Sequence, residues 1–277
     1  MLTIFTIPKP FRGNINIIQR NAIQSWLWLR PKCEIILFGD DEGVAEGAKE
    51  LGVFHIPEIE KNEFGTPFLS SAFNLAQKIA KNQILVYINA DIILMSDFIP
   101  AIQKIDKPLF LMSGQRYDLD IKQPIQFDEI DWEQKLKDDI KKEGKLHGYS
   151  GIDYFIFSRH LPYNLPPFAV GRPGWDNWLI YHMRSMKTPV IDATEIITAV
   201  HQNHRSVYHF RGEETQRNLK LTGGYSQMCT LRDADWILTR KNLKKPPFPR
   251  RVFAELALFY PWRLILSLKR KMQQFLS

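Results

Sequence analysis

Residues 84–91 have the sequence Ile84-Leu85-Val86-Tyr87-Ile88-Asn89-Ala90-Asp91, in which five apolar residues end abruptly in an amide, a small residue and an acid. A continuous apolar run of this length, bounded by polar residues, is typical of a strand buried on both faces of a parallel sheet. Open α/β sheets bind their ligands at the carboxyl ends of such strands. The stretch therefore predicts an α/β fold with a binding site beside Asp91.

The amide and the acid at the end of this run form a candidate cation site. Asn89 and Asp91 lie two positions apart, so on an extended chain both side chains point the same way. One divalent cation could take an oxygen from each, and oxygen ligands suit Mg²⁺ or Mn²⁺. The alternative is a strand end followed by a capping acid, because the apolar run Ile92-Ile93-Leu94 continues the chain. Spacing alone leaves both interpretations open.

The first hundred residues alternate between strand-like and helix-like patterns. Strands are expected at residues 2–7, 34–38, 53–56 and 84–91, and helices at 15–29, 43–51 and 70–80. This alternation predicts a mostly parallel sheet with right-handed crossovers and helices on its faces. A further strand is expected at 108–113 and an exposed helix at 130–143.

The composition narrows the class of protein. The 277 residues, 44% of them hydrophobic, are enough for one large globular domain plus an appendage. The two cysteines, Cys33 and Cys229, make neither a disulfide framework nor a zinc-ligand cluster. No signal peptide is recognisable, and no segment reaches about 18 uninterrupted apolar residues. We therefore expect a cytoplasmic protein.

The net charge of +7 belongs to the C-terminal tail. Residues 240–277 hold ten Lys and Arg residues and one acid, Glu255, which leaves the rest of the chain slightly acidic. The main domain also lacks a basic, aromatic-rich sheet, so no nucleic-acid partner is expected.

The tail has the pattern of an amphipathic helix. Beyond Pro261, the apolar residues at helical spacing are Ile265, Leu268, Met272 and Phe275, and the bases between them are Lys269, Arg270 and Lys271. Such a helix is typical of a membrane interface. We expect residues 250–277 to bind an anionic membrane surface, which would make the protein peripheral on the inner face of the membrane. The alternative is a helix that docks on the main domain.

Further polar residues are expected at the same edge of the sheet as Asp91. Asp40 and Asp41 follow the second strand and could accept hydrogen bonds from a ribose or a base. Alternatively, Asp40 caps the helix that begins near Gly43. Arg12 follows the first strand and could supply positive charge to a diphosphate.

A second candidate acid lies in Gly174-Trp175-Asp176-Asn177-Trp178-Leu179, just before an amphipathic helix. A helix N-terminus keeps a carboxylate ionised, and an ionised, positioned carboxylate can act as a general base toward an alcohol. The alternative is a simple helix cap, which explains the acid and leaves the flanking tryptophans unexplained.

Residues 199–209 contain His201, His204 and His209. Histidine is a frequent metal ligand, and one of these could complete a metal site with Asp91. The acid-rich partner sequence of a zinc hydrolase is absent. At least one of the three is expected to be structural only.

Taken in order, these features resemble a GT-A fold glycosyltransferase over residues 1–225. The DxD-like Asn89-Ala90-Asp91, the Gly174–Asn177 segment before a helix and the later histidines carry the resemblance. It implies that Asp91 is a metal ligand, that Asp176 is the base, and that His201, His204 or His209 also contributes to the metal. Asn89 departs from the family pattern, in which this position is an acid.

The resemblance also implies an organisation and an activity. Residues 1–240 would form the catalytic domain, with a nucleotide-sugar-binding half at 1–115 and an acceptor and catalytic half at 116–240. Residues 241–277 are the separate membrane-interface tail that the amphipathic pattern predicts. The enzyme would use Mn²⁺ or Mg²⁺ to transfer a sugar from a nucleoside-diphosphate donor, a UDP-sugar in the first instance, to a glycan or lipid-linked glycan in polysaccharide biosynthesis.

Two other functions stay open. The first is a non-catalytic protein that binds glycans or nucleotides. The second is a sugar-phosphate nucleotidyltransferase, which would need a Gly-rich basic loop after the first strand. The chain has Pro8-Lys9-Pro10-Phe11-Arg12-Gly13 there, so this alternative ranks low.

Overall fold

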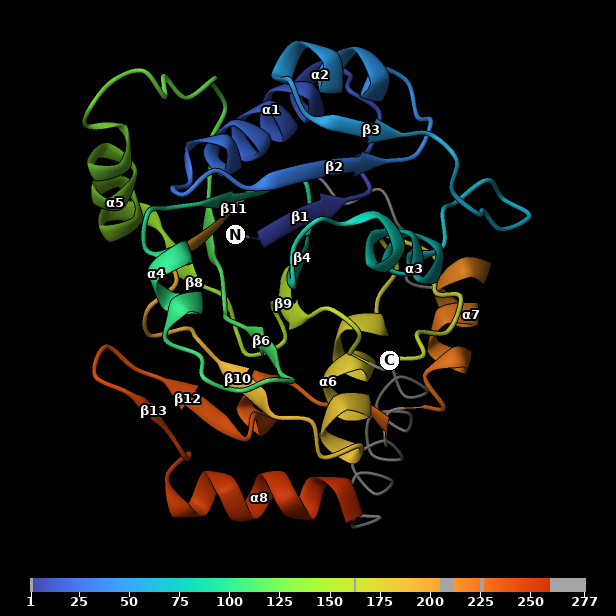
Figure 1. Cartoon of the computed structure of the whole chain (residues 1–277), viewed down its shortest axis with the longest axis vertical. Coiled ribbons are helices and arrows are strands. Elements are labelled where there is room, and N and C mark those ends of the chain that lie inside the picture. Colours follow the sequence, from blue (N-terminus) through green and yellow to red (C-terminus); the bar gives the residue numbers. More distant parts are fainter. Residues whose placement is uncertain (1, 162, 205–211, 225–226, 260–277) are drawn as a thin grey trace, which may run out of the picture.

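The computed structural model describes residues 2–161, 163–204, 212–224 and 227–259 of the chain. Its main sheet has nine strands in the order β13-β12-β10-β6-β9-β4-β1-β2-β3 (Figure 1). The strands are β1 (Leu2–Thr6), β2 (Glu34–Phe38), β3 (Phe54–Ile56), β4 (Ile84–Ile88), β6 (Leu111–Ser113), β9 (Tyr154–Ser158), β10 (Val190–Asp192), β12 (Trp236–Leu238) and β13 (Leu243–Lys244). Five of the pairings are parallel and three are antiparallel, which confirms the predicted mostly parallel sheet.

Helices cover both faces of this sheet. The helices of the described residues are α1 (Gly13–Trp28), α2 (Val44–Leu51), α3 (Leu69–Ile79), α4 (Phe98–Gln103), α5 (Trp132–Glu143), α6 (Trp175–Ser185), α7 (Glu213–Leu221) and α8 (Phe248–Phe259), of which α5 packs on the smaller sheet described below. Successive strand residues face opposite cores: Ile4 packs with α1 and α4, whereas Phe5 packs with α3 and α6. This two-sided burial is the reason that the strands are continuous apolar runs.

The first four strands are parallel and follow the predicted order of elements. The next strand in the sheet, β9, is antiparallel to both β4 and β6 and was not predicted. An apolar run such as Tyr154–Ser158 indicates a buried strand but contains no information about its direction. Because β9 inserts between two earlier strands, the parts of the chain before and after residue 115 share one sheet.

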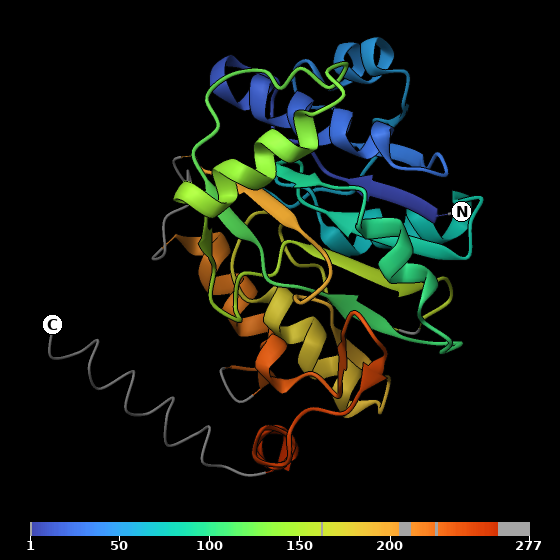
Figure 2. The same ribbon diagram turned by 90° about the vertical axis from the view of Figure 1, so that its left-hand side faces the viewer.

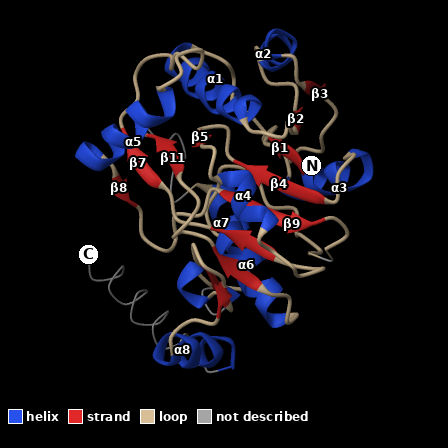
Figure 3. Cartoon of the chain, turned by 60° about the vertical axis from the view of Figure 1, so that its left-hand side comes forward, coloured by secondary structure: helices blue, strands red, loops and turns tan. Residues whose placement is uncertain are grey.

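A second, smaller sheet has the order β5-β11-β7-β8 and lies beside the main one (Figure 3). Its strands are β5 (Ile92–Leu94), β7 (Tyr117–Leu119), β8 (Lys145–Leu146) and β11 (Ala199–Gln202). The chain leaves β4, makes a turn at residues 90–91 and enters β5 at once. The apolar run that follows Asp91 is therefore a strand of a different sheet, and Asp91 lies where the two sheets meet.

The C-terminal helix α8 docks on the main domain, at the end of the molecule opposite α1 (Figure 2). Arg184 of α6, with 2% of its side chain exposed, donates to the carbonyl oxygen of Ala254 at 2.7 Å. Arg250 donates to Asp192 at 2.9 Å. The sheet reaches Lys244, so the main domain extends past the expected boundary at residue 240.

This docking matches the alternative interpretation for the first part of the expected tail. On the outer side of α8, Phe253 is 59% exposed and Leu256 37% exposed. The amphipathic pattern at residues 265–275 lies outside the described residues. None of the helices in the described part of the chain is long and apolar enough to cross a membrane.

Candidate metal and donor site

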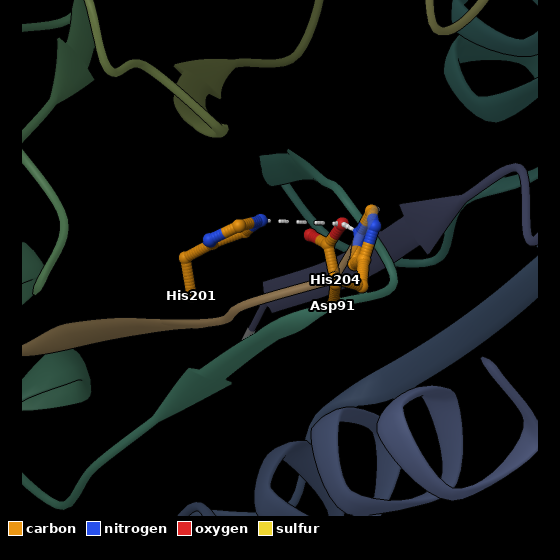
Figure 4. Close-up of side chains that lie close together, drawn as sticks. All are labelled: Asp91, His201 and His204. Atoms are coloured by element: carbon orange, nitrogen blue, oxygen red, sulfur yellow. Dashed lines mark hydrogen bonds and ion pairs between the residues drawn. The ribbon is translucent and has the colours of Figure 1, made fainter. Parts of the chain in front are cut away.

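Three predicted site residues meet beside the turn between β4 and β5, which contains Asp91; His201 lies on β11 and His204 just after it. Asp91, His201 and His204 each offer one ligand atom, and these atoms lie within 4.8 Å of one another. Nε2 of His204 lies 2.9 Å from Oδ2 of Asp91, and Nε2 of His201 lies 3.8 Å from the same oxygen. Figure 4 shows the two imidazoles on opposite sides of the carboxylate.

Strand pairing explains why these residues meet. β11 pairs antiparallel with β5, and His201 lies opposite Ile92, the residue after Asp91. The next residue, Gln202, is fully buried, and its backbone N–H donates to the carbonyl oxygen of Asp91 at 3.2 Å. The side chain of Gln202 donates to the carbonyl oxygen of Ile18 in α1 at 2.8 Å. The turn is thereby tied both to the small sheet and to the first helix.

The donor set fits a divalent cation. Oδ1 of Asp91 is buried and has no hydrogen-bond partner within the described part of the chain, so it is available to a ligand. Burial raises the pKa of Asp91, but the hydrogen bond from His204, together with the nearby His201 and Lys9, outweighs it and lowers the pKa to about 2. Burial lowers the pKa of His201, which favours the neutral imidazole that binds metals. One ionised carboxylate and two imidazoles suit Mn²⁺ and related divalent ions.

Asn89 has a different role from the one its spacing predicts. Its Nδ2 donates to Oδ1 of Asp153 at 2.8 Å, and its Oδ1 accepts from the hydroxyl of Tyr87 at 3.3 Å. The chain turns at residues 90–91, so the rule that alternate side chains point the same way does not apply across Asn89 and Asp91. Asn89 supports Asp153 in this structure, and the cluster at Asp91 forms without it.

Sequence reasoning missed a network of charged residues beside the cluster. Arg116 donates to Asp118 at 2.9 Å and also pairs with Asp153. His147 bonds to Asp118 at 2.6 Å, and Nδ1 of His201 lies 3.2 Å from Oδ1 of Asp118. Burial raises the pKa of Asp118, but the bonds from His147 and Arg116 outweigh it and keep the carboxylate ionised.

Two sequence signals could have indicated these residues. Arg116 comes directly before the short strand β7 and Asp118 lies two positions later within it, and Asp153 comes directly before the apolar run of β9. Their place in the site, however, depends on the pairing of β7 with β11, which puts Asp118 opposite His201. That pairing joins residues far apart in the sequence, so no local pattern shows it.

Asp176 lies in the first turn of α6, close enough to Asp153 for the two charges to interact. The helix begins after Gly174, whose φ of 104° favours glycine, so Asp176 is not the N-cap residue. The ring of Trp175 packs edge-on against Tyr87, with centroids 5.2 Å apart. Burial, together with the negative charge of Asp153, raises the pKa of Asp176 to about 6, although backbone N–H groups at the helix start act in the opposite direction.

The other predicted site residues have separate partners. Asp40 pairs with Lys61, and this hydrogen bond lowers the pKa of Asp40. Arg12 pairs with Glu42. The backbone carbonyl of Asp41 accepts from Val44 at 3.1 Å, and α2 begins after Gly43, so Asp40 does not cap it. His209 lies outside the described residues.

No protein-family model matches the sequence, and no curated protein matches it. Among solved structures, glucosyl-3-phosphoglycerate synthase from Mycobacterium tuberculosis, in complex with Mn²⁺, UDP and phosphoglyceric acid, has 14% identity and a TM-score of 0.48, over 80% of this chain and 78% of its own. The mannosyltransferase PcManGT from Pyrobaculum calidifontis, in complex with GDP-Man and Mn²⁺, has 17% identity and a TM-score of 0.47, over 97% and 73%. At these identities and scores the similarity assigns no activity to this chain, and the functional argument rests on the site.

Proposed function

We propose that this chain is a metal-dependent glycosyltransferase. It would transfer a sugar from a nucleoside-diphosphate donor, with a UDP-sugar as the first candidate, to a hydroxyl group of a glycan or lipid-linked glycan. The observation that carries the proposal is the meeting of Asp91, His201 and His204 at the carboxyl end of β4. This is the edge at which α/β sheets bind nucleotides.

On the donor side, Asp91, His201 and His204 would hold the cation, Mn²⁺ or Mg²⁺. A bound cation offsets the charge that develops on the departing diphosphate. Asp91 is ionised over the physiological pH range because its pKa is about 2. Burial lowers the pKa of His201, which favours its neutral form. Both shifts therefore favour the form that binds metal without first losing a proton.

On the acceptor side, Asp176 would take the proton from the attacking hydroxyl. A general base works best when its pKa lies near the working pH, and the pKa of Asp176 is raised to about 6. Its Oδ1 is buried and unpaired within the described ranges, so it can accept a new hydrogen bond. A base in this position corresponds to an inverting transfer, in which the hydroxyl attacks the face opposite the leaving group.

The two other functions have less support. A nucleotidyltransferase needs a flexible glycine-rich loop after β1, whereas Pro8 and Pro10 stiffen this loop here. A purely binding protein has no need of a buried carboxylate such as Asp176, whose Oδ1 is unpaired within the described residues and whose ionisation costs stability.

The proposal includes binding of the C-terminal region to a membrane surface. Phe248, Phe253 and Leu256 are exposed on α8, and the basic residues Lys244 and Arg251 lie close to them in the sequence. Residues 250–277 would hold the protein on an anionic membrane at the cytoplasmic face, where a lipid-linked acceptor would be met. Each base near such a surface contributes about 1 kcal/mol to binding.

The test is calorimetric titration of UDP and GDP into the protein with Mn²⁺ and with EDTA, followed by a hydrolysis screen of nucleotide sugars. Binding of one nucleotide only with Mn²⁺, and hydrolysis of a sugar nucleotide with the same base, is the expected result. Binding that EDTA leaves unchanged, or no binding of either nucleotide, would contradict the proposal.

A further inference from the structure

We propose that Lys9 is a donor-binding residue, whose ammonium group binds the diphosphate of the nucleotide sugar next to the cation. The inference deepens the proposed function and rests on it. Lys9 lies in the loop between β1 and α1, at the carboxyl edge of the main sheet.

The backbone of Lys9 is held in place by one buried side chain. The N–H of Lys9 donates to Oε1 of Gln19 at 2.7 Å, and Nε2 of Gln19 donates to the carbonyl oxygen of Lys9 at 2.8 Å. Gln19 is on α1 and is 2% exposed. Pro8 and Pro10 restrict the backbone on either side. Two hydrogen bonds and two prolines thus fix the position of the Lys9 backbone, from which the flexible side chain extends.

From this fixed start, the ammonium reaches the candidate metal site. Nζ of Lys9 lies 3.4 Å from Nε2 of His204, the nitrogen that lies 2.9 Å from Oδ2 of Asp91. An ionised carboxylate only accepts hydrogen bonds, so Nε2 carries the proton of this contact and cannot also accept from Lys9. The ammonium group therefore lies beside the candidate metal site, and Nε2 of His204 does not accept a hydrogen bond from it.

The charges at this edge indicate what the ammonium would bind. The diphosphate of a nucleotide sugar carries two negative charges and Asp91 adds a third, so one divalent cation leaves a net negative charge at the site. The nucleoside diphosphate that leaves after transfer carries one negative charge more. The neighbouring basic residues are already paired: Arg116 with Asp118 and Asp153, Arg12 with Glu42, and Lys61 with Asp40. Within the described part of the chain, Lys9 is in no ion pair. A phosphate can therefore engage Lys9 without first breaking an ion pair between described residues.

The experiment measures two affinities in Lys9→Met, Lys9→Arg and the control Lys32→Met. Lys32 is an exposed lysine just before β2, at the opposite edge of the sheet. The first is the affinity for Mn²⁺ alone, measured by electron paramagnetic resonance. The second is the affinity for UDP and for GDP at saturating Mn²⁺, measured by calorimetry.

Lys9→Met is expected to raise the Kd of the nucleotide by about tenfold or more, the size of one hydrogen bond to a charged group. Its affinity for Mn²⁺ alone is expected to stay the same or increase, because a neighbouring positive charge is removed. Lys9→Arg should keep most of the nucleotide affinity, and Lys32→Met should match the wild type.

Equal nucleotide affinity in wild type and Lys9→Met would overturn the assignment and leave the proposed function standing. Tighter binding of both Mn²⁺ and nucleotide in Lys9→Met would also overturn it, because Lys9 would then be a charge that competes with the cation. Failure of the wild type to bind either nucleotide would overturn the proposed function and the role of Lys9 with it.

Discussion

Oδ1 of Asp118 lies 3.2 Å from Nδ1 of His201, and the other nitrogen of the same ring, Nε2, is directed at Asp91. A carboxylate behind a metal-binding histidine orients the ring and raises its basicity. Asp118 is itself held by Arg116 and His147. The network places a carboxylate behind the ring of His201, at an ion-pair distance, although Nδ1 of His201 makes no hydrogen bond within the described part of the chain.

Asp118→Asn should therefore weaken Mn²⁺ binding about tenfold or more, the usual effect of losing such a supporting group. The matched control is Asp128→Asn, an exposed acid outside the cluster. Both affinities can be followed by electron paramagnetic resonance of Mn²⁺. An unchanged affinity in Asp118→Asn would mean that Asp118 does not support a metal ligand.

Asn89→Asp tests whether Asn89 is a metal ligand, as its spacing predicts, or a partner of Asp153, as the structure shows. If Asn89 shared the cation with Asp91, a second carboxylate would strengthen metal binding. In the structure, the new carboxylate would replace a donor that lies 2.8 Å from Oδ1 of Asp153, so two like charges would face each other. We expect a lower Tm and no gain in Mn²⁺ affinity. Tighter Mn²⁺ binding at unchanged Tm would restore Asn89 as a ligand.

Asp176→Asn should reduce the transfer rate by at least about 10²-fold, within the range that general-base catalysis supplies. Binding of UDP with Mn²⁺ should change little, because Asp176 is not among the three clustered candidate ligands. Product analysis of the wild type should show inversion at the anomeric carbon. A retained configuration, or near-wild-type turnover in Asp176→Asn, would remove Asp176 from the role of base.

The same substitution should also change stability with pH. The folded protein raises the pKa of Asp176 from 3.8 to about 6, so it holds the proton more tightly than the unfolded chain does. Stability from this group is therefore present at low pH and is lost as the pH rises through about 6, at a cost of up to about 3 kcal/mol. Asp176→Asn should raise Tm at pH 7.5 relative to wild type and should do so less at pH 4. An equal shift at both values would contradict the raised pKa.

The C-terminal region should divide into a structural part and a membrane-binding part. A chain that ends at Lys245 loses the partners of Arg184 on α8, Ala254 and Glu255, and leaves a buried guanidinium partly unpaired. Its Tm should fall. A chain that ends at Phe259 keeps these contacts and should melt like the full protein. The full-length chain should float with anionic liposomes, and less so at high salt. The chain ending at Phe259 should float less, because it keeps only the exposed apolar residues of α8. Equal flotation of the two chains would exclude residues 260–277 from the membrane contact.

The local patterns of the sequence predicted a good part of this structure. The run at residues 84–88 and the alternation before it were enough for the parallel strands β1 to β4 and the helices between them. They also indicated Asp91, because the end of a buried parallel strand is a local feature. The antiparallel strand β9 was missed because an apolar run does not state its direction.

The rest of the site depends on contacts between distant parts of the chain. Asp118 reaches His201 through the pairing of β7 with β11, and Asp153 reaches Asn89 through the pairing of β9 with β4. The proposed role of Lys9 was not predicted, because a lysine between two prolines matches no known binding motif. Its significance comes from Gln19, on the next helix, and from His204, close to it only in the fold.

The most direct test of the central claim is titration of UDP at saturating Mn²⁺ into the wild type and Asp91→Ala, with folding of both checked by circular dichroism. If Asp91 holds the cation, the wild type should bind UDP only with Mn²⁺, and Asp91→Ala should be folded but show no Mn²⁺-dependent binding. Mn²⁺-dependent binding of UDP by Asp91→Ala with wild-type affinity would contradict the account.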